Sequence, residues 1–177
     1  MGPYRHPVPP LWAPWRMQFI LEKKPKGCIF CLLPRQKKDR QNLILFRGKN
    51  AYVILNKFPY NNGHLMVVPN KHTSILGRLG AKTLSEMMDL AHRSMEYLTR
   101  SMGAQGHNVG FNFGHAAGAG ILDHLHLHIV PRWMGDTNFM PILAGNKVMV
   151  ECLQDTYDRL SPLFLSKRKR GPRKRGS

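Results

Sequence analysis

The stretch that decides the fold is Asp123-His124-Leu125-His126-Leu127-His128-Ile129-Val130-Pro131, in which three histidines alternate with Leu, Leu and Ile. On a β-strand, alternate residues share a face and lie about 6.6 Å apart. The pattern therefore predicts a strand over residues 124–130. One face of this strand would pack on the core, and the three imidazoles of the other face would point toward solvent, a ligand or a metal.

Three interpretations of the imidazole face can be weighed. A polar surface with incidental histidines is disfavoured by the strict alternation. A three-histidine catalytic zinc site is a second hypothesis, but a third ligand at twice the same-face spacing is hard to bring onto one tetrahedral ion. In the third, one imidazole is a nucleophile toward phosphorus and its neighbours donate hydrogen bonds to phosphate oxygens.

Length and composition favour one globular domain with tails. The chain has 177 residues, a hydrophobic fraction of 42% and a net charge of +17, which favours anionic partners. Its apolar runs are far shorter than a membrane span requires, so we expect no membrane segment and no signal peptide. Three cysteines do not make a disulfide framework, and a reducing, cytoplasmic location is the simplest expectation.

The two ends of the chain differ from the middle. Residues 1–27 are rich in Pro, aromatic residues and Lys, and we expect an extended N-terminal arm. Residues 28–160 form the predicted domain. Residues 161–177 form a basic tail, with seven cations and no acid between Lys167 and Arg175. The tail is expected to be disordered and solvated, or to associate weakly with nucleic acid or polyphosphate.

The rest of the chain predicts an α+β fold with a mainly antiparallel sheet. A helix is expected over 83–102, with Thr83 and Glu86 as a capping box and Gly103 as its C-cap. The apolar residues of this helix, several of them Met, recur at helical spacing and are expected in the core. A second helix is expected over about 150–160. Besides 124–130, strands are expected over 42–46, 51–55, 64–68 and 107–113.

The motif at His124–Val130 matches the His-x-His-x-His-x-x signature of the histidine triad family. The resemblance covers about residues 11 to 160 and includes five further parts of the chain. Leu55–Leu65 resembles its Asn-x-x-Pro…Gly-His segment, and Ala117–Gly120 resembles its loop before the triad. Leu11–Met17, the Cys28/Cys31 pair and Pro131–Phe139 resemble the prokaryotic diadenosine-tetraphosphate phosphorylase-like branch.

The resemblance implies an antiparallel sheet with a long helix, usually dimerised, and a reaction. His126 would attack the α-phosphorus of a nucleoside polyphosphate and form a nucleotidyl-histidine, which water or phosphate then resolves. A neutral imidazole suits this role, because its ordinary pKa lies near 6.5 and a lone pair is available at pH 7. His128, on the same face, would donate to the phosphoryl oxygens.

The resemblance also implies roles for residues outside the triad. Asn56 would contact the ribose, and Asn112 stands where related hydrolases carry a phosphate-contacting Gln. The backbone N–H groups of Ala117, Gly118, Ala119 and Gly120 could cradle phosphate. His64 is expected to be structural, although the family places it close to the site.

Cys28 and Cys31 form a Cys-x-x-Cys pair, which alone is a weak signal for zinc or for redox chemistry. Zinc-containing members of the family add two histidines, and His72 and His124 match their positions. The resemblance therefore implies a closed, structural Cys₂His₂ zinc site. This site would leave His126 and His128 for substrate, and no organic cofactor is expected.

The leading hypothesis is thus an enzyme that acts on dinucleoside polyphosphates, with diadenosine tetraphosphate as the expected substrate, by phosphorolysis or hydrolysis. One alternative is a hydrolase or phosphorylase of nucleoside phosphoramidates or adenylyl sulfate. An alternative of another class is a nucleotide- or nucleic-acid-binding module. The expected partners are the nucleotide substrate and a second copy of the chain.

Overall fold

The computed structural model describes residues 27–136 and 151–166. Residues 1–26 of the expected N-terminal arm and residues 167–177 of the basic tail lie outside the described residues. Within the described part, no helix is both long and apolar enough to cross a bilayer.

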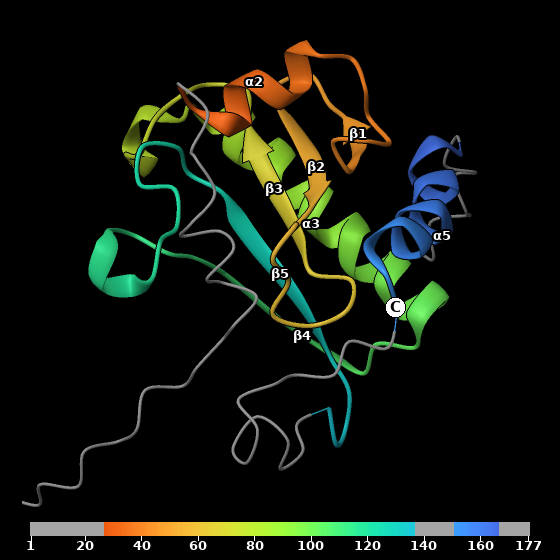
Figure 1. The fold of residues 1–177 in the computed structure, drawn as a ribbon. Coiled ribbons are helices and arrows are strands. Elements are labelled where there is room, and N and C mark those ends of the chain that lie inside the picture. The colour runs from red at the N-terminus through yellow and green to blue at the C-terminus, as the bar shows by residue number, and fades with distance from the viewer. Residues whose placement is uncertain (1–26, 137–150, 167–177) are drawn as a thin grey trace, which may run out of the picture.

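A five-stranded antiparallel sheet forms the centre of the molecule, in the order β1-β2-β3-β5-β4 (Figure 1). The α+β architecture is therefore confirmed. Three α-helices and two short 3-10 helices accompany the sheet in the described residues. The strands are β1 (Ile44–Arg47), β2 (Ala51–Leu55), β3 (Leu65–Pro69), β4 (Gly106–Phe111) and β5 (Leu127–Arg132). The helices are α2 (Ile29–Arg35), η1 (Leu76–Arg78), α3 (Ala81–Met102), η2 (His115–Ala117) and α5 (Leu153–Leu165).

Strands β2 and β3 are buried along their whole length, so both faces of the sheet are covered there. Helix α3 packs behind the sheet, against β2, β3 and β5, while α2 crosses the upper end of β2 and β3 (Figure 1). The Tyr52 hydroxyl donates to the carbonyl of Phe30 in α2 at 2.8 Å. Residues directly opposed on neighbouring strands share a face of the sheet. Ile54 opposes Met66, and Met66 opposes His128, so His128 lies on the face that α2 covers.

The long helix begins two residues earlier than predicted, and the predicted capping box is wrong. Its N-cap is Gly80, which has no side-chain cap hydrogen bond. The Glu86 carboxylate instead accepts from the backbone and the side chain of Asn50, at 2.9 and 2.6 Å, and so ties α3 to the β1–β2 turn. The predicted C-cap is confirmed, because Gly103 is left-handed with φ 63°. Met88 is 56% exposed and does not join the core.

Asp123–Pro131 is only partly a strand, so the predicted strand over residues 124–130 has the wrong bounds. β5 begins at Leu127, so His124 and His126 precede the ladder. The Leu125 amide donates to the carbonyl of Thr73 at 2.8 Å, and this bond holds the preceding segment against the loop that follows β3. The imidazole face is also not open to solvent, because His124, His126 and His128 are only 1, 6 and 9% exposed.

Helix α5 closes the far side of the core beside β1 and α3 (Figure 1). The Tyr157 hydroxyl donates to the carbonyl of Ile44 at 3.2 Å, and the rings of Tyr97 and Phe164 meet edge-to-face at 4.9 Å. The helix continues to Leu165. These contacts bind the end of the described chain to the sheet.

Candidate active site and metal centre

Two cysteines and two histidines converge at one end of the sheet. One ligand atom from each of Cys28, Cys31, His72 and His124 lies within 4.8 Å of all the others. The His124 Nδ1 is 3.2 Å from the Cys28 Sγ and 3.5 Å from the Cys31 Sγ. The His72 Nδ1 is 3.5 Å from the Cys31 Sγ and 3.3 Å from the His124 Nδ1.

These separations fit a tetrahedral zinc site. Zn–S bonds of about 2.3 Å and Zn–N bonds of about 2.0–2.1 Å at tetrahedral angles give N–S edges of about 3.5 Å and N–N edges of about 3.3 Å. The tautomer of His124 also fits. Its Nε2 is 2.8 Å from the carbonyl of Pro69, and a carbonyl only accepts, so Nε2 carries the proton and the Nδ1 lone pair faces the cluster.

Local structure brings the four donors together. Cys28 is the N-cap of α2, and its carbonyl accepts from the Cys31 amide at 3.1 Å, so one helical turn positions both thiols. His72 follows β3, and His124 follows the loop after β4. Burial, and then the neighbouring Cys28 thiol, raise the pKa of Cys31. A bound cation would reverse this effect, because it stabilises the thiolate.

His126 is held with one nitrogen ready to act as a nucleophile. Its Nδ1 lies 3.0 Å from the carbonyl of His124, so Nδ1 carries the proton and Nε2 keeps its lone pair. Burial lowers the pKa of His126, which keeps the ring neutral. The ring of Phe30 packs against it, with centroids 5.0 Å apart.

His128 is oriented by His64, a residue whose role the sequence prediction missed. The Tyr60 amide donates to the His64 Nδ1 at 3.0 Å, so the proton of His64 is on Nε2, which donates to the His128 Nδ1 at 2.9 Å. The Nε2 of His128 therefore carries a proton. Burial, and then His128 and His126, lower the pKa of His64 to about 3, so the His64 ring stays neutral. The sequence signals were the place of His64 near the site in the resembled family and its position at the start of a predicted strand, and neither shows that β3 pairs with β5.

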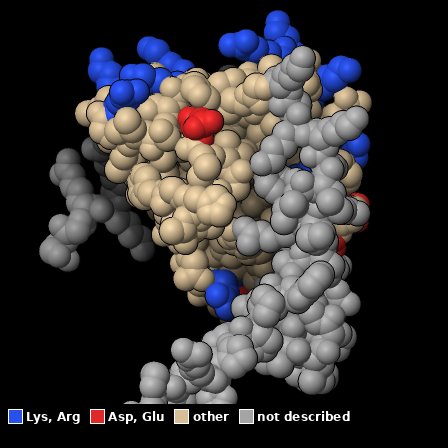
Figure 2. All heavy atoms as spheres, turned by 60° about the vertical axis from the view of Figure 1, so that its left-hand side comes forward, with Lys and Arg blue, Asp and Glu red and all other residues tan. Residues whose placement is uncertain are grey.

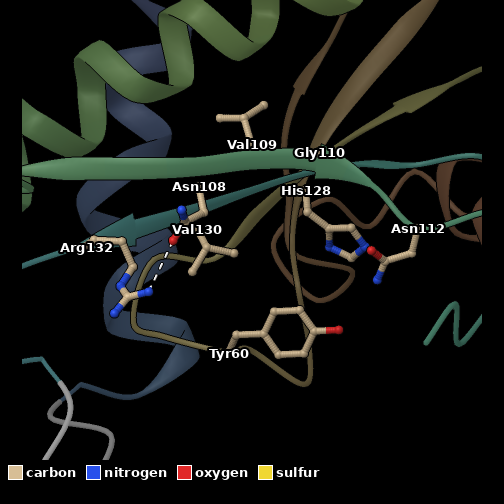
Figure 3. A pocket seen from close by; sticks show the side chains of 8 residues that line it. All are labelled: Tyr60, Asn108, Val109, Gly110, Asn112, His128, Val130 and Arg132. Carbon is tan, nitrogen blue, oxygen red and sulfur yellow. Dashed lines mark hydrogen bonds between the residues drawn. The ribbon is translucent and has the colours of Figure 1, made fainter. Parts of the chain in front are cut away.

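A pocket of about 340 Å³ lies next to His128, on the side of the sheet to which the His128 side chain points (Figure 3). The amide of Asn112 lies beside the imidazole of His128, and the ring of Tyr60 faces them across the pocket. The rings of His126 and His128 lie 4.7 Å apart. The structure thus brings the proposed nucleophile, its neighbouring donor and Asn112 into one neighbourhood.

Asn56 lies close to His64, but its side chain contacts other residues of its own turn. Its Oδ1 accepts from the Phe58 amide at 2.9 Å, and its Nδ2 is 3.3 Å from the His64 Nδ1. Asn56 thereby shapes the turn that carries Tyr60.

The loop of Ala117, Gly118, Ala119 and Gly120 lies between β4 and β5. The Gly118 amide donates to the carbonyl of His115 at 2.9 Å, and the Ala119 amide donates to that of Gly114 at 3.4 Å. Two of the four amides expected to cradle phosphate are therefore used within the loop. Gly118 is left-handed, with φ 79°, and ends the 3-10 turn.

Charge is unevenly distributed over the face of the molecule that Figure 2 shows. Figure 2 shows Lys and Arg side chains gathered along the upper rim of the molecule, with a largely uncharged area below them. A rim of this kind attracts anions toward the surface that it borders.

The site places two imidazoles side by side. His126 is neutral and has a lone pair on its Nε2, and His128 has an N–H donor on its Nε2. Such a pair can attack an electrophilic centre and stabilise the negative oxygen that develops there. Comparison with known proteins agrees with this geometry, because the family model called HIT domain matches residues 37–134. The chain belongs to the HIT domain family.

Two relatives within this family act on adenine nucleotides. The AP-4-A phosphorylase of Mycobacterium tuberculosis is 39% identical in an alignment of 155 residues, and the match covers 82% of this chain and 79% of that protein. An adenosine 5'-monophosphoramidase of Saccharomyces cerevisiae is 30% identical over 106 residues, or 60% of this chain and 63% of that protein. The chain is thus a relative of HIT-family nucleotide hydrolases and transferases.

A solved structure supports both the fold and the metal centre. A Zn-bound histidine triad family protein from Mycobacterium smegmatis superposes with a TM-score of 0.62 at 25% identity. The match covers 78% of this chain and 93% of that one. The four converging donors of this chain could hold a metal ion.

Proposed function

We propose that this protein transfers a nucleotidyl group from a dinucleoside polyphosphate, with diadenosine tetraphosphate as the substrate, through a covalent intermediate on His126. One observation carries the proposal. The bond from His126 Nδ1 to the carbonyl of His124 leaves the Nε2 lone pair free to attack, next to a His128 that is oriented as a donor. The 39% identity to an AP-4-A phosphorylase supports this choice of substrate.

The first step forms a P–N bond and breaks a P–O bond. The lone pair of His126 Nε2 attacks the α-phosphorus, and the bridging oxygen leaves with the bonding electrons as part of ATP. The N–H of His128 Nε2 stabilises the phosphoryl oxygens during this step. Asn112 adds a second donor beside His128.

The second step returns the enzyme to its starting state. Orthophosphate or water attacks the phosphorus of the nucleotidyl-histidine, and the P–N bond breaks back to the His126 lone pair. Phosphate gives ADP and water gives AMP. Asn56 and the Ala117–Gly120 loop are proposed to contact the ribose and the phosphate.

The proposed cofactor is zinc, held by Cys28, Cys31, His72 and His124. A closed site with four protein ligands supplies a structural cross-link between α2, the loop after β3 and the triad segment. The protein residues carry out each chemical step.

The proposal includes a homodimer in the cytoplasm. In the described residues β4 is an edge strand of the sheet and exposes Val109, which is 41% exposed, so a second copy could bind there. The basic tail is proposed to add weak association with nucleic acid or polyphosphate.

A second candidate is hydrolysis of nucleoside phosphoramidates or adenylyl sulfate, which needs the same nucleophile. The 30% identity to a monophosphoramidase favours the phosphoramidate. A pure nucleotide- or nucleic-acid-binding module is the alternative of another class. Tail-driven binding would weaken steeply as salt rises, whereas turnover at His126 would survive removal of residues 167–177.

The test is product analysis of diadenosine tetraphosphate incubated with the protein, with and without orthophosphate. ADP plus ATP formed only with phosphate identifies a phosphorylase, and AMP plus ATP without phosphate identifies a hydrolase of the same class. His126→Ala is the control and should form neither. If the wild-type protein turns over only a phosphoramidate, the second candidate replaces the first.

A further inference from the structure

We propose that the pocket beyond His128 is a subsite that binds the distal phosphates of the leaving group through Arg132 and Asn108. This inference rests on the proposed function, because it takes the α-phosphate to lie between His126 and His128. It adds a reason for the enzyme to prefer polyphosphates over substrates with a small leaving group.

The sheet register lines these residues up on one face. His128, Val130 and Arg132 alternate along β5, and their partners in β4 are Gly110, Asn108 and Gly106. Figure 3 shows His128 at one end of the pocket and Arg132 at the other, with Asn108 and Val130 between them. Four residues of strand span about 13 Å, a distance suited to a chain of several phosphates that leads away from His128.

The pocket is open along this line. The residue opposite His128 is Gly110, and a Cβ built there would meet no atom within 4 Å. The absence of a side chain at Gly110 therefore leaves free volume beside the imidazole. Tyr60, 37% exposed, forms the wall facing the strands, and its ring lies 28° from the plane of His128 with centroids 5.9 Å apart.

Arg132 is held in place before any ligand arrives. Its Nε and Nη2 donate to the Asp136 carboxylate at 2.6 and 2.8 Å, and its Nη1 donates to the Asn108 Oδ1 at 3.1 Å. These bonds use three of the five guanidinium N–H groups. A guanidinium fixed in this way loses little freedom when it binds a phosphate oxygen.

The lining chemistry suits an anion. None of the eight lining residues is acidic, and the set includes one guanidinium, two Asn amides and the imidazole of His128. Asp136 balances part of the charge of Arg132, so the pocket would recognise phosphate by hydrogen bonds as well as by charge. The amine that leaves from a phosphoramidate has no distal phosphate and would not reach Arg132.

The test replaces the amide of Asn108 with a carboxylate, which removes the proposed N–H donor to phosphate and places a negative charge in the pocket. Asn108→Asp keeps an oxygen that accepts from Arg132. We expect the KM for diadenosine tetraphosphate to rise about tenfold or more, because a charge-assisted contact is replaced by repulsion. The effect should grow from the triphosphate to the pentaphosphate analogue. The kcat/KM for adenosine 5'-phosphoramidate should stay within about twofold of wild type, because binding energy lost at a remote contact affects only substrates that make it.

Gln36→Glu is the matched control, because it introduces the same charge at the exposed end of α2 and keeps the oxygen that accepts from Asn42. It should leave both substrates unaffected. An unchanged KM for diadenosine tetraphosphate in Asn108→Asp, or an equal loss on both substrates, would overturn the subsite. Failure of the wild-type protein to turn over diadenosine tetraphosphate would instead overturn the proposed function.

Discussion

The carbonyl of His124 accepts a hydrogen bond from the Nδ1 of His126 at 3.0 Å, while the imidazole of the same His124 faces the sulfurs of Cys28 and Cys31. One residue therefore connects the candidate metal centre to the proposed nucleophile. The backbone of His124 selects the tautomer of His126, and its side chain joins the cluster. A change at the cluster should consequently be felt at the active site.

The first prediction concerns this connection. Cys31→Ser should abolish stoichiometric zinc binding, measured by elemental analysis, because a hydroxyl is a poor zinc ligand. It should also lower the melting temperature, since a four-ligand site contributes to folding. Cys152→Ser, at an exposed cysteine outside the cluster, is the control and should retain metal and stability. Normal zinc content in Cys31→Ser would refute the Cys₂His₂ assignment.

The second prediction is a pH dependence of stability that comes from His64. The pKa of this buried ring is about 3 in the folded state, whereas an unfolded histidine has a pKa near 6.5. Between these values the unfolded chain binds a proton that the folded chain does not, so the free energy of unfolding falls as the pH falls. The slope from this group approaches about 1.4 kcal/mol per pH unit below pH 6.

The measurement is denaturant unfolding of wild type and His64→Gln between pH 7 and pH 5. The stability advantage of wild type over the variant should shrink as the pH falls, because Gln does not titrate. His92→Gln makes the same substitution at an exposed position on α3 and separates the effect of burial from the loss of any one histidine. Parallel curves for wild type and His64→Gln would show that His64 does not stay neutral.

The third prediction tests the turn that leads into His64. Gly63 has φ +74°, and a Cβ built there would lie 2.8 Å from the Met102 Sδ and 2.9 Å from the Leu98 Cδ2. Gly63→Ala should therefore lower the free energy of unfolding by about 1–3 kcal/mol, from backbone strain and overpacking. Gly77→Ala, where a Cβ meets nothing within 4 Å, should change it little. Equal effects would mean that the end of α3 does not pack on this turn.

Much of the fold could be predicted from local sequence patterns. Strand β2 was predicted with its observed bounds, because a short run of Val, Ile and Leu lies between turn residues. The C-terminus of α3 was predicted because only glycine adopts its left-handed cap easily. The wrong predictions came from contacts between residues that lie far apart in the sequence. Glu86 resembles a capping residue in the sequence but binds Asn50, and this contact depends on how α3 packs against the sheet.

The candidate site shows the same limit. Alternation singled out the three histidines His124, His126 and His128, and the resemblance to a known family gave the catalytic roles of His126 and His128 and the four candidate metal ligands. The relay from Tyr60 through His64 to His128 could not be predicted, because it requires β3 to pair with β5. The pocket that ends at Arg132 was missed for a similar reason, since it depends on the register of β4 against β5.

The most direct test of the central claim is to trap the covalent intermediate. The protein is mixed with diadenosine tetraphosphate, quenched within the first turnover and digested at alkaline pH, which preserves a phosphoramidate bond. Mass spectrometry should then find one adenylyl group on His126, and His126→Ala should carry none. Turnover of the substrate with His126 unmodified, or with the label on another residue, would contradict the account.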